Sequence, residues 1–351
     1  MNKLLETVKK YPQTQIWNDS CSCKELQYAI DNGAVGATTN PVIVLNVLKN
    51  EMDDWKECIE NLIQDNPTAS EDDIAWKLIK IMGTKASKLL LPIFENSQKT
   101  SGRISFQTNP KYFNNAEKMV AHALSLTRGL PNAQIKIPAS KAGIEACEEL
   151  TYQGISINAT ISFTVSQAIA VAEAVERGLK RRQKENLPIE DIHPVCTIMA
   201  GRVDDYLKKD CSNKNMLIEP EPFEWAGVAV VKHAYNIYQG RKYKTRLLVA
   251  AFRNPYHWLE FIGGDIVLTI PYKWQNRYNS SDYEIKNFMQ KPIETIYLNK
   301  LKQFEEFNKA YAENGLSAEE FENYGAFKMT ILSFLEGYDE LCKLIRGYMV
   351  K

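Results

Sequence analysis

Short apolar runs alternate with longer segments of helical periodicity along most of this chain. Each run is four to eight residues long and is bounded by turn residues, which is typical of buried strands. The eight predicted strands are Thr14–Asn18, Gly36–Thr39, Arg103–Gln107, Gln134–Pro138, Ser156–Ser162, His193–Ala200, Arg246–Phe252 and Asp265–Ile270. Eight such alternations within about 260 residues predict an α/β fold of the (β/α)8 TIM-barrel type.

The segments between the strands carry apolar residues at helical spacing. The predicted helices include Cys23–Gly33, Asn115–Arg128, Lys141–Gln153, Val165–Gln183 and Glu224–Gln239, and residues 43–91 predict two or three more within one connection. Gly33, Gly154 and Gly240 stand where glycine often ends a helix. A doubly wound open sheet is the alternative fold, but no glycine-rich dinucleotide loop supports it.

The length of 351 residues suits a single domain. We expect a barrel over residues 14–275 and a helical C-terminal extension over residues 276–351 that packs on the barrel. The extension shows helical apolar spacing in Ile285–Phe307 and in Tyr324–Met349.

Composition narrows the possible partners and the cellular location. The chain is 25% charged with a formal net charge of zero, which gives no global field for nucleic acid or an anionic membrane. No apolar run is long enough to span a membrane and the first residues lack a signal-peptide core, so we expect a cytoplasmic protein. The seven scattered cysteines predict free thiols. Cys21 and Cys23 alone are a weak zinc signal and the four histidines are far apart in sequence, so no metal is expected.

The run Gln134–Ala139 places a single lysine, Lys136, within a predicted strand. A buried ammonium is costly to desolvate, and burial lowers the pKa of a lysine. A neutral lysine in a dry pocket is the nucleophile that forms a Schiff base with a ketone. The alternative is a lysine that reaches solvent or pairs with a carboxylate.

Polar residues gather at the ends of the predicted strands, where the active site of a barrel is built. They are Asp19, Asn40, Gln107, Lys136, Asn158, Thr160, Arg202 and Arg253. One lysine, one carboxylate and two arginines suit a carbonyl substrate with an anionic tail. Lys136 would be the nucleophile, Asp19 the proton shuttle, and the two arginines an anion clamp.

Several of these residues also have a purely structural interpretation. Asp19 could cap the following helix, and Asn40 before Pro41 is a common turn pair. Arg202 is followed by two aspartates and could form a surface ion pair. The basic run 177–182 resembles a nucleic-acid patch, but its position at a helix end favours a solvated face that complements the helix dipole.

The ordered set of motifs resembles the transaldolase family, the Schiff-base enzymes of the pentose phosphate pathway. The resemblance runs from Ile16 to Pro271. The matching segments are Trp17-Asn18-Asp19, Val35-Gly36-Ala37-Thr38-Thr39-Asn40-Pro41, Gly102-Arg103-Ile104-Ser105, Ile135-Lys136-Ile137-Pro138-Ala139-Ser140, Gly154–Thr160, Ala200-Gly201-Arg202-Val203-Asp204, Ala251-Phe252-Arg253-Asn254-Pro255 and Thr269-Ile270-Pro271.

The resemblance implies a role for each candidate residue. Lys136 would form the Schiff base, and Asp19 would remove the proton that starts cleavage of the C–C bond. Thr160 would orient the water that makes and breaks the adduct. The implied substrate contacts are Asn40 and Asn158 to hydroxyls and Arg202 and Arg253 to the phosphate.

Three positions depart from the family pattern. Gln107 stands where the family usually has glutamate, and its amide can orient a water but cannot titrate. The related fructose-6-phosphate aldolases also have glutamine there, together with a tyrosine at the position that matches Met199. Ala251 replaces a serine that many members have near the phosphate.

The resemblance therefore implies transfer of a dihydroxyacetone unit from a ketose phosphate, or a similar anionic sugar, to an aldehyde. An aldolase that releases dihydroxyacetone and a catalytically silent sugar-phosphate-binding barrel are the alternatives. No cofactor is expected. The expected partner is the small-molecule substrate, with a homo-oligomer also possible.

Overall fold

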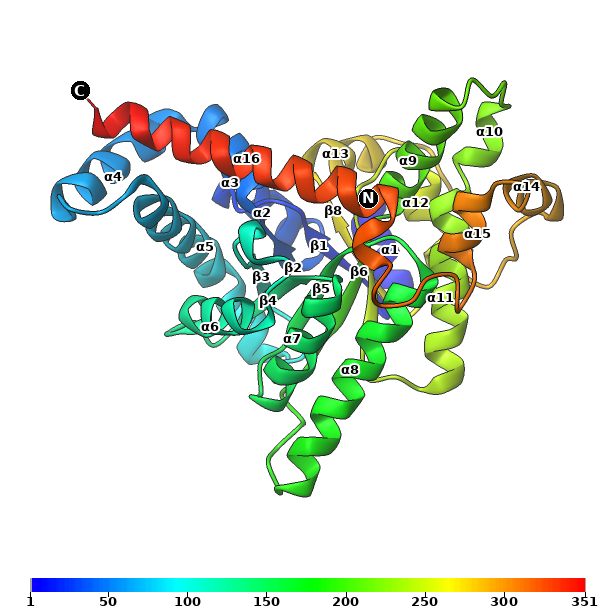
Figure 1. Cartoon of the computed structure of the whole chain (residues 1–351), viewed down its shortest axis with the longest axis horizontal. Coiled ribbons are helices and arrows are strands. Elements are labelled where there is room, and N and C mark those ends of the chain that lie inside the picture. Colours follow the sequence, from blue (N-terminus) through cyan, green and yellow to red (C-terminus); the bar gives the residue numbers. More distant parts are fainter. Residues whose placement is uncertain (1, 351) are drawn as a thin grey trace.

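The computed structural model of the chain describes residues 2–350 and contains a closed barrel of parallel strands (Figure 1). Each strand pairs with the next one along the chain, and the last pairs with the first. The strands are β1 (Thr14–Asn18), β2 (Ala34–Thr38), β3 (Arg103–Gln107), β4 (Ala133–Pro138), β5 (Ile157–Ser162), β6 (Val195–Ile198), β7 (Arg246–Val249) and β8 (Ile266–Ile270). The predicted (β/α)8 fold is confirmed.

The largest errors in the predicted strands are at the ends of β6 and β7, which are shorter than expected. Met199 leaves the strand conformation and forms the N-cap of the next helix. Ala251, two residues after the end of β7, has a φ of +64°, a left-handed conformation outside the β region. Because β6 and β7 both end early, the connection from each strand to the following helix begins close to the mouth of the barrel.

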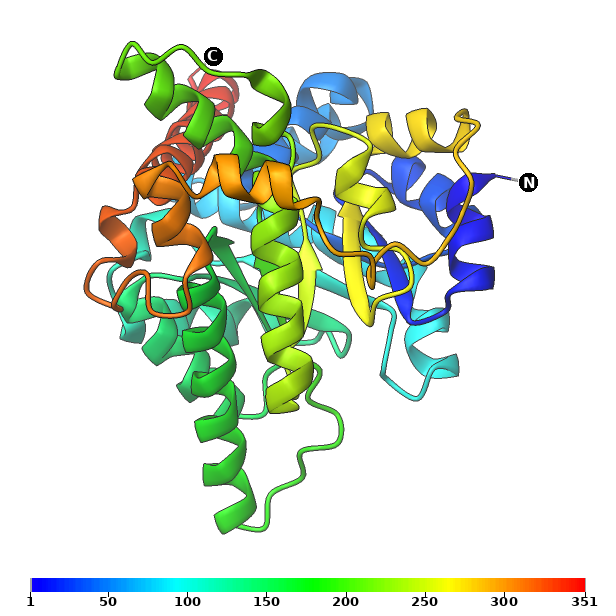
Figure 2. The same ribbon diagram turned by 90° about the vertical axis from the view of Figure 1, so that its right-hand side faces the viewer.

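The five helices predicted with bounds begin and end within two residues of the prediction, and residues 43–91 hold three helices, the last of which runs on to Asn96. Helices lie in every connection between the strands. They are α2 (Cys23–Asp31), α3 (Pro41–Asn50), α4 (Met52–Asp65), α5 (Glu71–Asn96), η1 (Pro110–Tyr112), α6 (Ala116–Thr127), α7 (Lys141–Tyr152), α8 (Val165–Lys184), α9 (Ala200–Asn213), α10 (Pro220–Phe223), α11 (Ala226–Arg241), α12 (Tyr256–Leu259) and α13 (Tyr272–Asn279), with α1 (Lys3–Lys10) before the barrel. Figure 2 shows α8 and α11 side by side against the barrel. The predicted cap Gly240 is wrong, because α11 continues through it and Lys242 takes the left-handed conformation instead.

The C-terminal region begins with an irregular segment rather than the predicted helix. Residues 281–294 contain no helix, and α14 (Thr295–Leu301), α15 (Glu305–Tyr311), η2 (Phe321–Asn323) and α16 (Gly325–Met349) follow. The buried Lys232 amine donates to the carbonyls of Phe288 and Lys291, at 2.8 and 2.7 Å. These tertiary bonds hold the segment against α11. The prediction for Tyr324–Met349 agrees with α16, whereas the division of the chain at residue 275 stays a prediction.

Helix α16 crosses the end of the barrel at which the strands finish (Figure 1). It packs against α3, η1, α9 and β5, each of which contributes to that end of the barrel. Gly337 permits this close approach, because a Cβ atom there would lie 2.5 Å from the side chain of Val42. The C-terminal helix thus covers part of the barrel mouth.

Side chains on the strands alternate between the barrel interior and the surrounding helices. Trp17, Val195, Leu248 and Val267 form a separate apolar cluster, which we place in the barrel interior from this alternation. Gly36 makes room for this cluster, because a Cβ atom there would lie 2.5 Å from the Trp17 ring. The polar candidates follow nearer the strand ends, so the apolar cluster closes the bottom of the site.

The basic run on α8 is mainly a surface feature. Arg177 pairs with Glu148, and Arg181 pairs with Glu148 and Glu149 on the neighbouring helix α7. The exposed residues of the run agree with the predicted solvated face, whereas their ion pairs with α7 were not predicted. Within residues 2–350 no helix is long and apolar enough to cross a membrane.

The ion pair between Lys232 and Glu260 gives a stability prediction. Its side chains are only 8% and 7% exposed, and the charged atoms lie 2.6 Å apart. Removing one partner leaves an uncompensated buried charge, so Glu260→Gln should lower the free energy of unfolding by about 3–5 kcal/mol. Denaturant unfolding measures the change. As a matched control, Glu340→Gln breaks the exposed pair with Lys49 and should cost less than about 1 kcal/mol. Equal losses in the two variants would contradict the prediction.

Candidate active site

Lys136 lies on β4 and is 4% exposed. Its neighbours in the sequence, Ile135 and Ile137, belong to the main core, so the alternation of the strand turns Lys136 to the barrel interior. Burial lowers the pKa of its amine, while the negative charge of Asp19 acts in the opposite direction. The amine makes no hydrogen bond or ion pair with any residue of the described chain. Of the two interpretations of this lysine, the structure favours the buried, unpaired amine.

Asp19 follows the last residue of β1 and faces the same interior. The Thr38 hydroxyl donates to its Oδ1 atom at 2.6 Å, and the Thr269 hydroxyl lies 2.7 Å from that of Thr38. Since a carboxylate can only accept, Thr269 must donate to Thr38 when Asp19 is ionised. Burial raises the pKa of Asp19, while Lys136 and Thr38 lower it. The capping interpretation is wrong, because Ser22 caps the following helix.

Gln107 and Thr160 supply unpartnered oxygens beside the lysine. Gln107 pairs with Lys136 in the register of β3 and β4, and Thr160 is opposite Pro138 on β5. Gln107 Oε1 and Thr160 Oγ1 are both buried and have no hydrogen-bond partner within residues 2–350. Buried polar atoms are normally satisfied, so these two oxygens are available to a water or a substrate.

Asn158 is on the same level of the barrel but is already engaged. It is opposite Lys136 in the register, donates to the Ser105 hydroxyl at 3.0 Å and accepts from the Thr197 hydroxyl at 2.6 Å. One amide proton and one lone pair remain for a ligand. The bonds to β3 and β6 fix the orientation of this amide.

The backbone is strained next to Thr160. Ile161 has a φ of +52°, which is rare for a β-branched residue and costs about 1–3 kcal/mol. The register between β5 and β6 shifts there. The buried Gln167 amide holds the turn by donating to the carbonyls of Ala139 and Ile161, at 2.9 and 3.2 Å. The strain lies at the site rather than in the body of the barrel.

Asn40 serves as a helix cap in this structure. Its side chain accepts from the backbone N–H of Ile43 at 2.9 Å, and Pro41 occupies the first position of α3. Asn40 and Pro41 thus begin a helix rather than forming the expected turn pair, and the substrate contact of Asn40 stays a prediction. The capping bond leaves the amide nitrogen of Asn40 free for a ligand.

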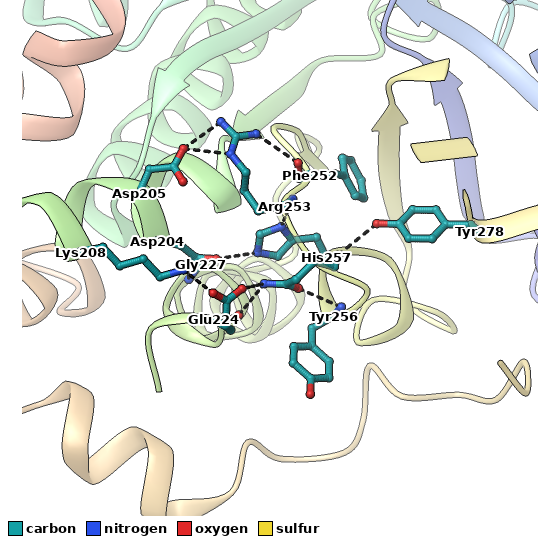
Figure 3. Close-up of polar contacts among 11 residues, drawn as sticks. Asp204, Asp205, Lys208, Glu224, Gly227, Phe252, Arg253, Tyr256, His257 and Tyr278 are labelled. Carbon is teal, nitrogen blue, oxygen red and sulfur yellow. Dashed lines mark hydrogen bonds and ion pairs between the residues drawn. The ribbon is translucent and has the colours of Figure 1, made fainter. Parts of the chain in front are cut away.

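Arg202 and Arg253 come from the neighbouring segments after β6 and β7. Burial first, and then the positive charge of Arg253, lower the pKa of Arg202. Arg253 binds Asp205 through Nε at 2.9 Å and Nη2 at 2.8 Å (Figure 3). Among the described residues Arg202 forms no ion pair, so the predicted pairing with its neighbouring aspartates is wrong.

Close packing joins the two arginine segments. A Cβ atom on Gly201 would lie 1.9 Å from the Ala251 carbonyl and 2.6 Å from Arg253 Cγ, so only glycine fits there. The Arg202 guanidinium lies 6.0 Å from the centre of the Phe334 ring on α16. Arg202 is thus covered on one side by the C-terminal helix.

Sequence reasoning missed Thr38, Asp205, Phe334 and His257. Thr38 lies within the motif of residues 35–41, and the alternation of side chains along β2 would have predicted that it faces the barrel interior. The other three depend on contacts between distant segments. No group of three or more metal-binding side chains occurs in residues 2–350. All seven cysteines lie in this range as free thiols.

A buried lysine, a carboxylate and two arginines lie on or just after the strands of a closed parallel barrel, the arrangement in which barrel enzymes build their active sites. The family described as Transaldolase/Fructose-6-phosphate aldolase matches residues 16–327, and the chain belongs to this family.

Individual relatives are more distant. The chain is 30% identical to "Transaldolase 2" of Streptomyces avermitilis over 233 residues, which are 64% of this chain and 62% of that protein. It is 30% identical to "Transaldolase" of Kocuria rhizophila over 232 residues, with the same coverage of both chains. It is 29% identical to "Transaldolase" of Mycobacterium tuberculosis over 239 residues, or 64% and 61% of the two chains. The matched region thus spans somewhat less than two thirds of these relatives.

Proposed function

We propose that the protein is a Schiff-base transaldolase that moves a dihydroxyacetone unit from a ketose phosphate to an aldehyde acceptor. The main support for this proposal is the Lys136 amine, which is buried, has no partner among the described residues and interacts with the negative charge of Asp19. Family membership and the names of the relatives support it. The reaction needs no cofactor, and the proposed setting is cytoplasmic carbohydrate metabolism through the pentose phosphate pathway.

The reaction begins at the Lys136 amine. The neutral nitrogen attacks the ketone carbon of the donor, and the resulting carbinolamine loses its oxygen as water to leave a protonated Schiff base. Thr160 and Gln107 hold that water through their unpartnered oxygens. Because the Gln107 amide cannot titrate, Asp19 is the proposed group that gives protons to this water and takes protons from it.

Cleavage of the C–C bond follows. Asp19 takes the proton from the C4 hydroxyl, the C3–C4 bond breaks, and its electrons move into the protonated Schiff base to form an enamine. The aldehyde product leaves. The enamine then attacks the acceptor aldehyde, Asp19 returns a proton to the new alkoxide, and hydrolysis releases the product ketose and frees Lys136.

An aldolase that releases dihydroxyacetone is the second candidate, and Gln107 favours it because the related fructose-6-phosphate aldolases also have glutamine there. Met199 argues against close similarity, since it supplies no hydroxyl. Product analysis with and without an aldose phosphate acceptor separates the two functions. Transfer should require the acceptor, whereas release of free dihydroxyacetone without one would support the aldolase. A lack of both turnover and covalent trapping would instead indicate a binding barrel.

The arginine pair gives a substrate prediction. Arg202→Met and Arg253→Met should each raise KM for a ketose phosphate by about 10- to 100-fold, because a charge-assisted hydrogen bond to the phosphate is lost. Steady-state kinetics measures the effect. Trapping of dihydroxyacetone, which has no phosphate, should not change. Arg177→Met on the exposed face of α8 is the matched control, and a KM that rises equally in this control would contradict the assignment.

A further inference from the structure

A buried histidine and aspartate lie beside Arg253 (Figure 3). His257 on α12 and Asp204 on α9 are both fully buried, and Nε2 of the ring lies 2.9 Å from Oδ2 of the carboxylate. Neither atom has a hydrogen-bond partner elsewhere in the described chain. The reaction proposed above uses neither residue.

The other nitrogen of His257 defines the tautomer of the ring. His257 Nδ1 accepts the backbone N–H of Arg253 at 3.0 Å, so this nitrogen carries no proton. The ring is then neutral and carries its proton on Nε2, facing Asp204. Asp204 is itself fixed, because its Oδ1 atom accepts the backbone N–H of Gly227 at 2.8 Å.

This pair connects the two segments that present the arginines. Asp204 is two residues after Arg202 on the same helix, and His257 binds the backbone of Arg253 directly. The turn before Arg253 is strained at Ala251, whose φ is +64°. Such a conformation persists only where its surroundings hold it, and the bond from Arg253 to His257 is one such restraint.

We propose that His257, oriented by Asp204, is a positioning residue for the anion site. It holds the backbone of Arg253 so that this guanidinium and that of Arg202 meet the same anionic group of the substrate. The inference rests on the proposed phosphate-binding role of the two arginines. It assigns His257 no contact with the substrate.

Two substitutions separate the two contacts of the ring. His257→Asn places an amide oxygen near the position of Nδ1 and can keep the bond to Arg253. His257→Gln places an amide nitrogen near Nε2 and can keep only the contact with Asp204. The glutamine variant should raise KM for a ketose phosphate about tenfold with little change in kcat, and the asparagine variant should recover most of that loss.

Asp204→Asn tests the orienting contact. One of its two atoms becomes a donor, which then faces either the Gly227 N–H or the proton on Nε2. The second case drives the proton to Nδ1, against the Arg253 N–H. KM for the ketose phosphate should therefore rise in this variant too, while trapping of dihydroxyacetone stays unchanged. Thermal unfolding of each variant shows whether it is folded.

Nitrogen-15 NMR of the wild-type histidines tests the geometry without any substitution that could unfold the chain. The expected signal of His257 is that of a neutral ring protonated on Nε2, and a proton on Nδ1 at neutral pH would overturn the proposal. The proposal would also be overturned if His257→Gln and Asp204→Asn are folded and keep the wild-type KM. If Arg253→Met leaves KM unchanged, the proposed phosphate site fails instead, while the NMR signal still reports the contact from His257 to Arg253.

Discussion

Lys136→Ala should abolish covalent trapping of a ketose donor by borohydride. The wild-type protein should gain the mass of a reduced dihydroxyacetone adduct on Lys136, located by peptide mass spectrometry. Lys136→Arg should fail as well, because a guanidinium stays protonated and cannot attack a ketone. Turnover should fall to background in both variants, since no other lysine is expected to form the adduct.

The control for this experiment is Lys141→Ala. Lys141 begins α7 just beyond the end of β4, and its side chain is 54% exposed. It is therefore more accessible than Lys136 but lacks the burial that lowers the pKa of the active amine. Trapping that survives in Lys136→Ala, or is lost in Lys141→Ala, would contradict the assignment.

The pH dependence of trapping follows from the same burial. Only the neutral amine attacks, so the rate of adduct formation should rise with pH and level off above the pKa of Lys136. Because that pKa is lowered in the fold, the midpoint should lie below the ordinary lysine value of 10.5.

The sequence predicts the barrel well, because the spacing of apolar residues within each strand and helix indicates which of its faces is buried. Lys136 could be placed from its apolar neighbours alone, since alternation along a strand turns it away from them. The end of β7 could not be predicted, because Ala251 takes a left-handed φ that its side chain does not favour. Residues 285–294 belong to a stretch with helical apolar spacing but form no helix, because tertiary bonds from Lys232 override that local preference.

The contacts between site residues were harder to predict than the residues themselves. Asp205 is 48 positions from Arg253 and nearer in sequence to Arg202, yet it binds Arg253. Asp204 and Asp205 are adjacent on one helix and therefore point in different directions, one to the buried His257 and one to the half-exposed Arg253. A local reading of the sequence cannot separate these two partners, because the separation depends on how α9 packs against the segment after β7.

Asp19→Asn should separate adduct formation from C–C bond cleavage. The amide is similar in size and can still accept from the Thr38 hydroxyl, but it cannot take a proton from the substrate. Loss of a placed general base should lower kcat by about 10²- to 10⁴-fold, measured with a ketose phosphate and an acceptor. The reduced adduct should still form with dihydroxyacetone, because attack by the amine needs no C–C cleavage, but it should form more slowly, because loss of water from the carbinolamine uses Asp19 as proton carrier.

The same variant makes a second, independent prediction about Lys136. The negative charge of Asp19 raises the pKa of the Lys136 amine against the effect of burial. Removing that charge should lower the pKa further, so the midpoint of the trapping rate should move to lower pH. Thr38→Val is the matched control, because it removes the donor to Asp19 and keeps the charge. A folded Asp19→Asn protein with near wild-type kcat would exclude Asp19 as the base, and an unmoved midpoint would show that its charge does not act on Lys136.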